Sequence, residues 1–212
     1  MIHNVFHFTR TQRTARDGLK ISQTGFLNSV KLFITIKSIN KWDIFYFVYG
    51  LLHHPQYRTK YAANLKRELP RLPLVKDFSD LSTAGKRLAD LHINYELQPE
   101  YELKKVYNQS FKQSLRVEKM RLSKDKTQLR YNDFMTLKGI PIETFEYRLG
   151  NRSALEWIVD QYRVKVDKRS GIENDPNRLD DAQYILKLIG QIITVSLDTV
   201  KIVKGIEKLE IE

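Results

Sequence analysis

The side chains of this sequence that are best suited to chemistry are arginines, lysines and asparagines, which bind anions and read nucleic-acid bases. An arginine guanidinium is a planar fork that matches guanine O6 and N7 or a phosphate, and an asparagine amide can pair with adenine N6 and N7. These residue types gather in three stretches between residues 116 and 169. The candidate DNA-binding residues are Arg116, Lys119, Arg121, Arg130, Asn132, Arg148, Asn151, Arg152, Lys165, Lys168 and Arg169.

The first stretch has a pattern that favours a β-hairpin. Apolar and basic residues alternate imperfectly over residues 114–122, a polar turn follows at 123–126, and a second apolar segment covers 129–137. Strands and their loops can enter a groove of DNA, so outward cations here are suited to contacting it. Outward charge is also common on ordinary strands, and the alternation is too irregular to fix the register.

The second stretch surrounds Gly150, which lets the backbone approach a ligand closely because glycine has no Cβ. Arg148, Asn151 and Arg152 lie beside this glycine and present donors for base edges or phosphates. The same pattern also fits an ordinary helix N-terminus that is capped by Asn151 or Ser153. Both interpretations remain open at this stage.

The third stretch follows an amphipathic segment whose apolar residues recur at helical spacing. Lys165, Lys168 and Arg169 come directly after it, and Asp167 is the single carboxylate among them. One carboxylate cannot neutralise the whole group, so this stretch favours contact with a phosphate. A solvated charged surface is the alternative.

Composition and charge agree with a polyanionic partner. The chain has 36 Lys and Arg against 25 Asp and Glu, a formal net charge of +11, and the excess lies in residues 1–60 and 111–170. Each phosphate that a protein neutralises releases condensed counterions, so double-stranded DNA is the expected partner, although the charge could serve solubility alone. No apolar run approaches the roughly 20 residues of a membrane span, and the N-terminus has no signal peptide pattern, so we expect a cytoplasmic protein.

The residues that often form catalytic or metal sites give little support for an enzyme. There is no cysteine, which excludes disulfides, thiolate metal sites and a cysteine nucleophile. The adjacent His53 and His54 point in different directions on a helix, so a capping or surface role is favoured, and a structural role is favoured for His92. No phosphate-binding glycine motif is present. We therefore expect no catalytic activity, no cofactor and no bound metal.

Apolar periodicity indicates the elements that must position these residues. The expected helices cover residues 42–52, 55–69, 79–92, 154–162 and 180–207, the last as one long helix or a broken pair. Residues 94–112 read as an irregular connection. Together with the hairpin, the helices predict an α+β fold, a mostly helical single domain with a small central antiparallel sheet. Residues 1–37 lack helical or alternating periodicity and are expected to be loosely ordered, whereas 38–212 form the domain.

Helical spacing also assigns the core. Trp42 and Trp157 are expected to be core residues rather than platforms for base stacking, because they fall on apolar faces. The expected inward face of the first helix comprises Trp42, Phe45, Val48, Tyr49 and Leu52, and Phe47 and Leu51 widen it.

Several separated blocks resemble one family. They are Asp43-Ile-Phe-Tyr-Phe-Val-Tyr-Gly-Leu-Leu-His53, Tyr57-Arg-Thr-Lys-Tyr-Ala62, Leu69-Pro-Arg-Leu-Pro73, Leu88-Ala-Asp-Leu-His-Ile-Asn-Tyr95, Tyr147-Arg-Leu-Gly-Asn-Arg-Ser-Ala-Leu-Glu-Trp157 and Ser170-Gly-Ile-Glu-Asn-Asp-Pro-Asn177. In this order they resemble the C-terminal target-recognition domain of type ISP restriction-modification enzymes, over residues 39–203. No resemblance is found in residues 1–37, which suggests a remnant of a longer chain or a start site inside a longer gene.

The resemblance implies sequence-specific recognition of duplex DNA for a system that methylates adenine N6 and restricts DNA. In that family the domain follows a methyltransferase, a helicase-like translocase and a nuclease, so S-adenosylmethionine, ATP and Mg²⁺ would belong to those domains. The Asn-Pro-Pro-aromatic tetrapeptide of the methyltransferase is missing from this chain. A split subunit that acts with a separate or formerly fused methyltransferase or helicase is one expectation.

Two other functions stay open from the sequence. In the first, the chain is a protein-interaction module whose helices at Trp42 and at residues 180–203 dock onto a partner methyltransferase or helicase without direct base readout. In the second, His53, His54 and His92 form an enzyme site. Dependence of DNA binding on salt distinguishes the first alternative from DNA recognition.

Overall fold

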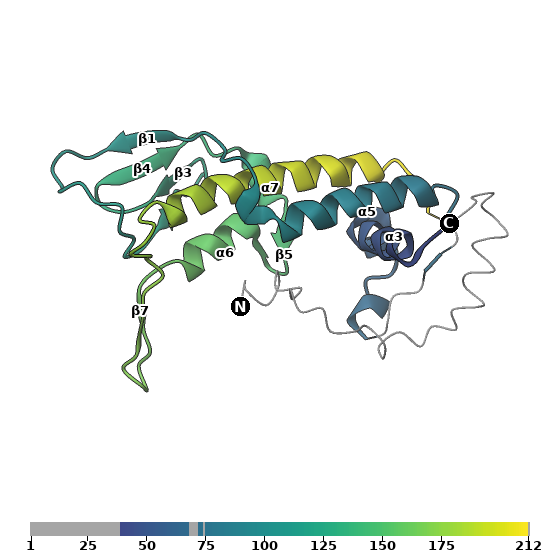
Figure 1. Ribbon diagram of the computed structural model, residues 1–212, viewed down its shortest axis with the longest axis horizontal. Coiled ribbons are helices and arrows are strands. Elements are labelled where there is room, and N and C mark those ends of the chain that lie inside the picture. The colour runs from purple at the N-terminus through teal and green to yellow at the C-terminus, as the bar shows by residue number, and fades with distance from the viewer. Residues whose placement is uncertain (1–38, 68–71, 74, 212) are drawn as a thin grey trace. The chain divides into compact units, whose positions relative to one another are not determined.

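The structure is a computed structural model that describes residues 39–67, 72–73 and 75–211 (Figure 1). The expectation of loose order for residues 1–37 lies outside the described residues. Two compact units are present. Unit 1 comprises residues 39–93 and 201–211 of the described chain, and unit 2 comprises residues 94–200. The expected class is confirmed, since the described residues form five α-helices and a small antiparallel sheet.

Unit 1 is built from helices. They are α3 (Lys41–His53), α4 (Pro55–Lys60), the 3-10 turn η1 (Asn64–Lys66), α5 (Phe78–Ile93) and the end of α7 (Tyr184–Ile206). Asn40 caps α3, because its side chain accepts hydrogen bonds from the amides of Trp42 and Asp43 at 2.8 and 3.2 Å. The Asp43 carboxylate accepts in return from the Asn40 amide at 2.9 Å, which completes a capping box.

Two glycines set the packing of α3 against α5. A Cβ on Gly85 would overlap the carbonyl oxygen of Tyr46, and a Cβ on Gly50 would overlap that of Leu81. The two helix backbones therefore approach more closely than any other residue would allow. Phe47 stacks on Phe78 with ring centroids 4.8 Å apart in the core beside this contact.

The expected inward face of α3 is confirmed in part. Phe47 and Leu51 are buried, and Val48 and Leu52 pack partly buried against the same core. Trp42 and Phe45 are 65% and 38% exposed, so the core role expected for them is wrong. Trp42 instead lies beside Tyr46 with ring centroids 6.1 Å apart. The buried stripe of the helix, which includes Gly50, is narrower than the apolar face that periodicity selects.

Unit 2 carries the four-stranded sheet. Its strands are β1 (Lys104–Tyr107), β2 (Arg121–Leu122), β3 (Gln128–Arg130) and β4 (Met135–Lys138), in the antiparallel order β1-β4-β3-β2. The inner face of the sheet holds Leu129, Met135 and Leu137, which are buried. The expected hairpin turn is present between β2 and β3, but residues 129–137 form two strands rather than one, and β1 replaces part of the expected irregular connection.

The remainder of unit 2 consists of short hairpins and helices. The 3-10 turn η2 (Tyr95–Leu97) precedes the sheet and η3 (Ile142–Phe145) follows it. Next come β5 (Arg148–Leu149) paired with β6 (Arg152–Ser153), α6 (Ala154–Gln161), β7 (Lys165–Val166) paired with β8 (Glu173–Asn174), and residues 184–200 of α7. The β7–β8 hairpin extends away from the rest of unit 2 (Figure 1).

The last helix is continuous rather than broken. Gly190 does not interrupt it. The lack of a side chain there lets residues 100 and 101 approach the helix, and the Tyr101 amide donates to the Gly190 carbonyl at 3.1 Å. Among the described helices, none is long and apolar enough to cross a membrane.

Candidate nucleic-acid interface

The register of the sheet brings four cations onto one face. Residues that stand directly opposite each other on neighbouring strands point to the same side. Lys104 pairs with Lys138 and Arg121 pairs with Arg130, while the alternate positions Met135 and Leu137 are buried. We call the outer side of the sheet the basic sheet face, and it consists of Lys104, Arg121, Arg130 and Lys138.

The electrostatics of this face favour an anion. Like charges directly opposite each other on adjacent strands are destabilising, and Arg121 stands opposite Arg130. Arg130 forms an ion pair with Asp133 at 2.5 Å. No residue of the four strands is acidic, and the other three cations form no ion pair with any residue that the structure describes. A bound phosphate would relieve the repulsion.

A second group of cations surrounds one carboxylate. Arg152 of β6, Arg163 and Lys165 of β7 lie 3.1, 3.0 and 3.9 Å from the oxygens of Asp160 at the end of α6. We call these four residues the Asp160 cluster. The Arg152 guanidinium also lies over the ring of Trp157, 5.4 Å from its centroid. The cluster keeps a net charge of +2, but its arginines are held in place by the carboxylate.

The turn between β5 and β6 presents a polar tip. Gly150 has a φ of +72°, which glycine adopts without strain, and Arg148 donates to the carbonyl of Asn151. Asn151 is exposed, and its side chain bonds to no other described residue. Ser153 rather than Asn151 caps α6, because the Glu156 amide donates to its hydroxyl at 3.2 Å. Asn151 is thus available for contact with a base.

The tip of the β7–β8 hairpin carries two exposed cations, Lys168 and Arg169. Asp167 does not neutralise them, because its carboxylate accepts hydrogen bonds from the amides of Ser170 and Arg169 at 2.8 and 2.9 Å. The bond from the Ser170 amide is the largest cause that lowers the pKa of Asp167. The carboxylate shapes the turn and leaves both cations facing solvent.

Two of the candidate residues serve the folding of the loop before β2. The Asn132 amide donates to the carbonyls of Ser114 and Arg116 at 2.9 and 3.0 Å, and its oxygen accepts from the amides of Phe134 and Met135 at 3.0 and 2.8 Å. Arg116, the other candidate, forms ion pairs with Glu118 and Asp175. These bonds give Asn132 a structural role that leaves its amide little capacity for a base.

The Asp175-Pro176-Asn177 segment anchors the same loop. Arg116 lies 2.6 Å from Asp175 and 2.6 Å from Glu118. The Asn177 side chain accepts from the Val117 amide at 2.8 Å and donates to the Val117 carbonyl at 2.9 Å. Hydrogen bonds from Asn177 are the main reason that the pKa of Asp175 is lowered. This segment joins two parts of unit 2 that are distant in the sequence.

Sequence reasoning missed Lys104 and Lys138. Lys104 belongs to an exposed edge strand, in which no alternation between apolar and polar residues marks a strand. Lys138 follows the alternation of buried Met135 and Leu137 with half-buried Thr136, so that pattern was a signal for its outward direction. Lys119 is exposed just before β2 and lies outside the paired residues of the sheet.

The histidines of unit 1 are part of its packing. His54 stands at the cap position between α3 and α4, where its backbone amide donates to the Leu51 carbonyl, so the capping role expected for it is confirmed and the surface role is wrong. His54 is buried and its Nε2 lies 3.2 Å from the Leu209 carbonyl oxygen. The Tyr49 hydroxyl lies 2.8 Å from His92 Nδ1, and the Tyr49 carbonyl lies 2.7 Å from His53 Nδ1. Burial lowers the pKa of His92 to about 3 and also lowers that of His53. Within the described residues, no group of His, Asp and Glu could hold a metal ion.

The profile of the Type ISP C-terminal specificity domain matches residues 10–188. The match begins within the segment in which no resemblance was expected, so that expectation is wrong. No curated protein sequence matches the chain.

Three solved structures are similar to the chain. A nuclease-deletion mutant of the type ISP restriction-modification enzyme LlaGI, in complex with a DNA substrate mimic, has 42% identity and a TM-score of 0.74, over 82% of this chain and 14% of that one. The ATP-dependent type ISP enzyme LlaBIII bound to DNA has 38% identity and a TM-score of 0.77, over 89% and 12%. A DrdV–DNA complex has 29% identity and a TM-score of 0.76, over 89% and 20%. The chain therefore spans a fifth or less of the length of these similar chains.

Proposed function

Because this chain belongs to the type ISP C-terminal specificity domain family, we propose that it recognises a specific sequence of duplex DNA. It does so for a restriction-modification system that methylates adenine N6, in the cytoplasm. The chain itself performs no catalytic step, binds no cofactor and supplies the target sequence to catalytic domains in a fused or separate polypeptide. The DNA complexes of the three similar enzymes support this proposal.

The observation that carries the proposal is the basic sheet face. Its cations come from four strands and meet on one surface, where two of them repel each other and one has a described carboxylate partner. Phosphate contacts of this kind set the register and orientation of a protein on a duplex, without reading its sequence. Lys168 and Arg169 at the tip of the β7–β8 hairpin add two further phosphate contacts.

Sequence readout is assigned to the β5–β6 turn. Asn151 presents an amide whose groups bond to no other described residue, and Arg152 stands beside it on β6. Asp160 fixes the direction of the Arg152 guanidinium. Bidentate pairing with guanine requires a guanidinium that is held in one orientation. Arg148 holds the backbone of the turn.

Selection from a pool of duplexes with a randomised segment tests the proposal. We expect the protein to enrich one short sequence, and each base pair changed within that sequence to weaken binding by about 1 to 3 kcal/mol. An Asn151→Ala variant should lose preference at one position of the enriched sequence while it still binds DNA. If the protein retained all duplexes of the pool equally, sequence-specific recognition would be contradicted. If it retained none, the DNA-binding role would be contradicted as well.

One observation favours docking onto a partner methyltransferase or helicase as a second function. Trp42 and Phe45 are 65% and 38% exposed on α3 with ring centroids 6.0 Å apart, and contiguous exposed apolar surface often marks a protein interface. A Trp42→Ser variant should bind DNA as the unchanged protein does but associate less tightly with a methyltransferase part that is produced separately. Equal association of both proteins would remove this function.

A further inference from the structure

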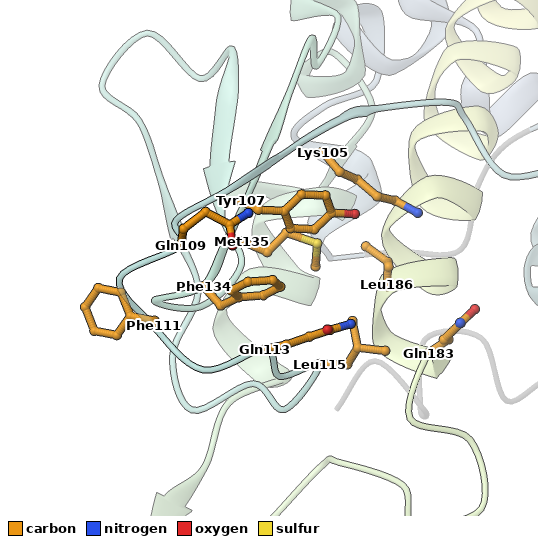
Figure 2. Close-up of a pocket in the computed structure, with 10 residues that line it drawn as sticks. All are labelled: Lys105, Tyr107, Gln109, Phe111, Gln113, Leu115, Phe134, Met135, Gln183 and Leu186. Atoms are coloured by element: carbon orange, nitrogen blue, oxygen red, sulfur yellow. The ribbon is translucent and has the colours of Figure 1, made fainter.

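Unit 2 contains a pocket of about 530 Å³ at the β1 edge of the sheet (Figure 2). Lys105 and Tyr107 point into it from β1, on the side of the sheet opposite to Lys104, since they pair with the buried Leu137 and Met135. Gln183 and Leu186 close the other side from the start of α7. The pocket is therefore distinct from the basic sheet face, although both include residues of β1 and β4.

Aromatic rings form one wall of this pocket. Tyr107 and Phe134 lie one above the other in Figure 2, with ring centroids 5.2 Å apart and planes inclined at 30°. Tyr107 is 47% exposed and Phe111 is 46% exposed. Solvent-facing aromatic rings provide stacking surfaces for any nucleobase, because every base has a π-face.

Three side-chain amides accompany the rings. Those of Gln109, Gln113 and Gln183 form no hydrogen bond with any residue in the described part of the chain. Each amide offers two N–H donors and a carbonyl acceptor, the combination that pairs with the edge of a base such as adenine. All three glutamines are exposed, so their amides are accessible to a ligand.

The charge of the residues that line the pocket indicates which group is attached to a base bound there. Lys105 is the one charged residue among the ten described residues that line the pocket. A cation without a carboxylate beside it suits a phosphate. The volume lies within the roughly 300 to 1,000 Å³ that is usual for small-molecule sites and exceeds what a single side chain would occupy. A ligand that has a π-face, a planar hydrogen-bonding edge and a phosphate is a nucleotide.

We propose that this pocket binds one nucleotide of a DNA strand whose base has left the helical stack. Tyr107 and Phe134 contact the base, the glutamine amides bond to its edge, and Lys105 contacts its phosphate. The inference rests on the proposed DNA-binding function and adds a second mode to it, since the basic sheet face holds paired duplex. The cost of extruding a base is least when that base is already unpaired.

Binding to three DNA ligands tests the inference. They are a fully paired duplex, the same duplex with one extra bulged adenine, and deoxyadenosine monophosphate. We expect the unchanged protein to bind the bulged duplex more tightly than the paired one. Tyr107→Ala should weaken binding of the bulged duplex by roughly 5- to 150-fold, as loss of one stacking ring does, and leave binding of the paired duplex as it was. Gln183→Ala should give a smaller loss in the same direction.

Adjacent lysines supply a matched control. Lys105→Ala removes a charge from the pocket and should lower the preference for the bulged duplex. Lys104→Ala removes the same charge from the other side of β1 and should weaken both duplexes by the same factor, so the preference stays. Circular dichroism melting of each variant checks that the fold is retained.

The outcomes separate the two proposals. Equal binding of bulged and paired duplexes, or a preference that survives Tyr107→Ala, would overturn the pocket inference and leave the proposed function standing. Mononucleotide binding without a preference for the bulge would assign the pocket to a free nucleotide and would also overturn the inference. Failure of the protein to bind any duplex would overturn the proposed function, and the inference with it.

Discussion

The histidines of unit 1 face inward, whereas the cations of the basic sheet face in unit 2 face solvent. His54 and His92 are buried and bonded to the groups around them, and burial keeps the pKa of His92 near 3. The cations of the basic sheet face stand on strands whose other face is the core. Residue type is thus a weaker guide to function than the direction of the side chain and the partners that it already has.

The two units also differ in the property that a substitution is expected to change first. Unit 1 depends on a close approach between α3 and α5, which tolerates no side chain at two glycines. In unit 2, two like charges, Arg121 and Arg130, lie directly opposite each other on an exposed surface and repel each other. Changes in unit 1 should therefore alter stability first, and changes on the sheet face of unit 2 should alter ligand binding first.

The largest effect is expected from Gly85→Ala in unit 1. The new Cβ would overlap the Tyr46 carbonyl oxygen and force α3 and α5 apart, at a cost of about 3 kcal/mol or more in the free energy of unfolding. Gly205→Ala is the matched control, because a Cβ there meets no atom and alanine favours the helix by about 1 kcal/mol. Thermal and urea unfolding measure both. A Gly85→Ala protein as stable as the unchanged one would contradict the packing.

The next effect sharpens the role of unit 2. A triple variant with Lys104→Gln, Arg121→Gln and Lys138→Gln should lose about 100- to 1,000-fold in duplex affinity at 0.1 M salt, since three phosphate contacts and their released counterions are gone. Its melting temperature should not fall, because repulsion is removed. The control changes Lys41, Lys66 and Lys208 to Gln in unit 1, and an equal loss of affinity there would mean that total charge rather than the sheet face binds DNA.

A smaller effect concerns pH and the buried histidines of unit 1. The unfolded chain protonates His92 below about pH 6.5, whereas the folded protein keeps it neutral down to about pH 3. The free energy of unfolding should therefore be highest above pH 6.5 and fall, by about 1.4 kcal/mol per pH unit for this residue, as pH drops toward 3. Urea unfolding at several pH values measures the slope. His92→Asn should flatten it, and an unchanged slope would assign the pH dependence to other groups.

The smallest effects separate readout from phosphate contact within unit 2. Arg152→Ala should relax the preference at one base pair by about 1 to 3 kcal/mol, because Asp160 holds the guanidinium in a fixed direction. Lys168→Ala should weaken all sequences alike and by a similar or smaller amount. Competition between duplexes that differ at single positions measures both. The same profile for the two variants would contradict this division of roles.

The sequence predicts much of the helical part and less of the sheet. The helix of Trp42 is found and its expected face includes the buried Phe47 and Leu51, but Trp42 and Phe45 are exposed, because the buried stripe is narrower than the apolar face. The turn between β2 and β3 is found, while the turn between β3 and β4 is missed. The signal for that turn is present in the sequence, because Asn132 and Asp133 are residues that turns favour, and the Asn132 side chain accepts from the Phe134 and Met135 amides.

The candidate site is predicted in part for a related reason. Arg121 and Arg130 are identified by type, but their place on one face depends on strand register, which irregular alternation leaves undetermined. Lys104 and Lys138 join them only once the pairing of β1 with β4 is known. The role of Asp160 as the shared partner of three cations depends on contacts between three elements, and no local pattern reveals it.

The salt dependence of duplex binding tests the central claim most directly. If the protein neutralises six phosphates, the logarithm of its association constant should fall with the logarithm of salt concentration at a slope of about −5. The triple variant of Lys104, Arg121 and Lys138 should show a slope that is shallower by about 2.5. A slope near zero for the unchanged protein, or the same slope in both proteins, would contradict the account.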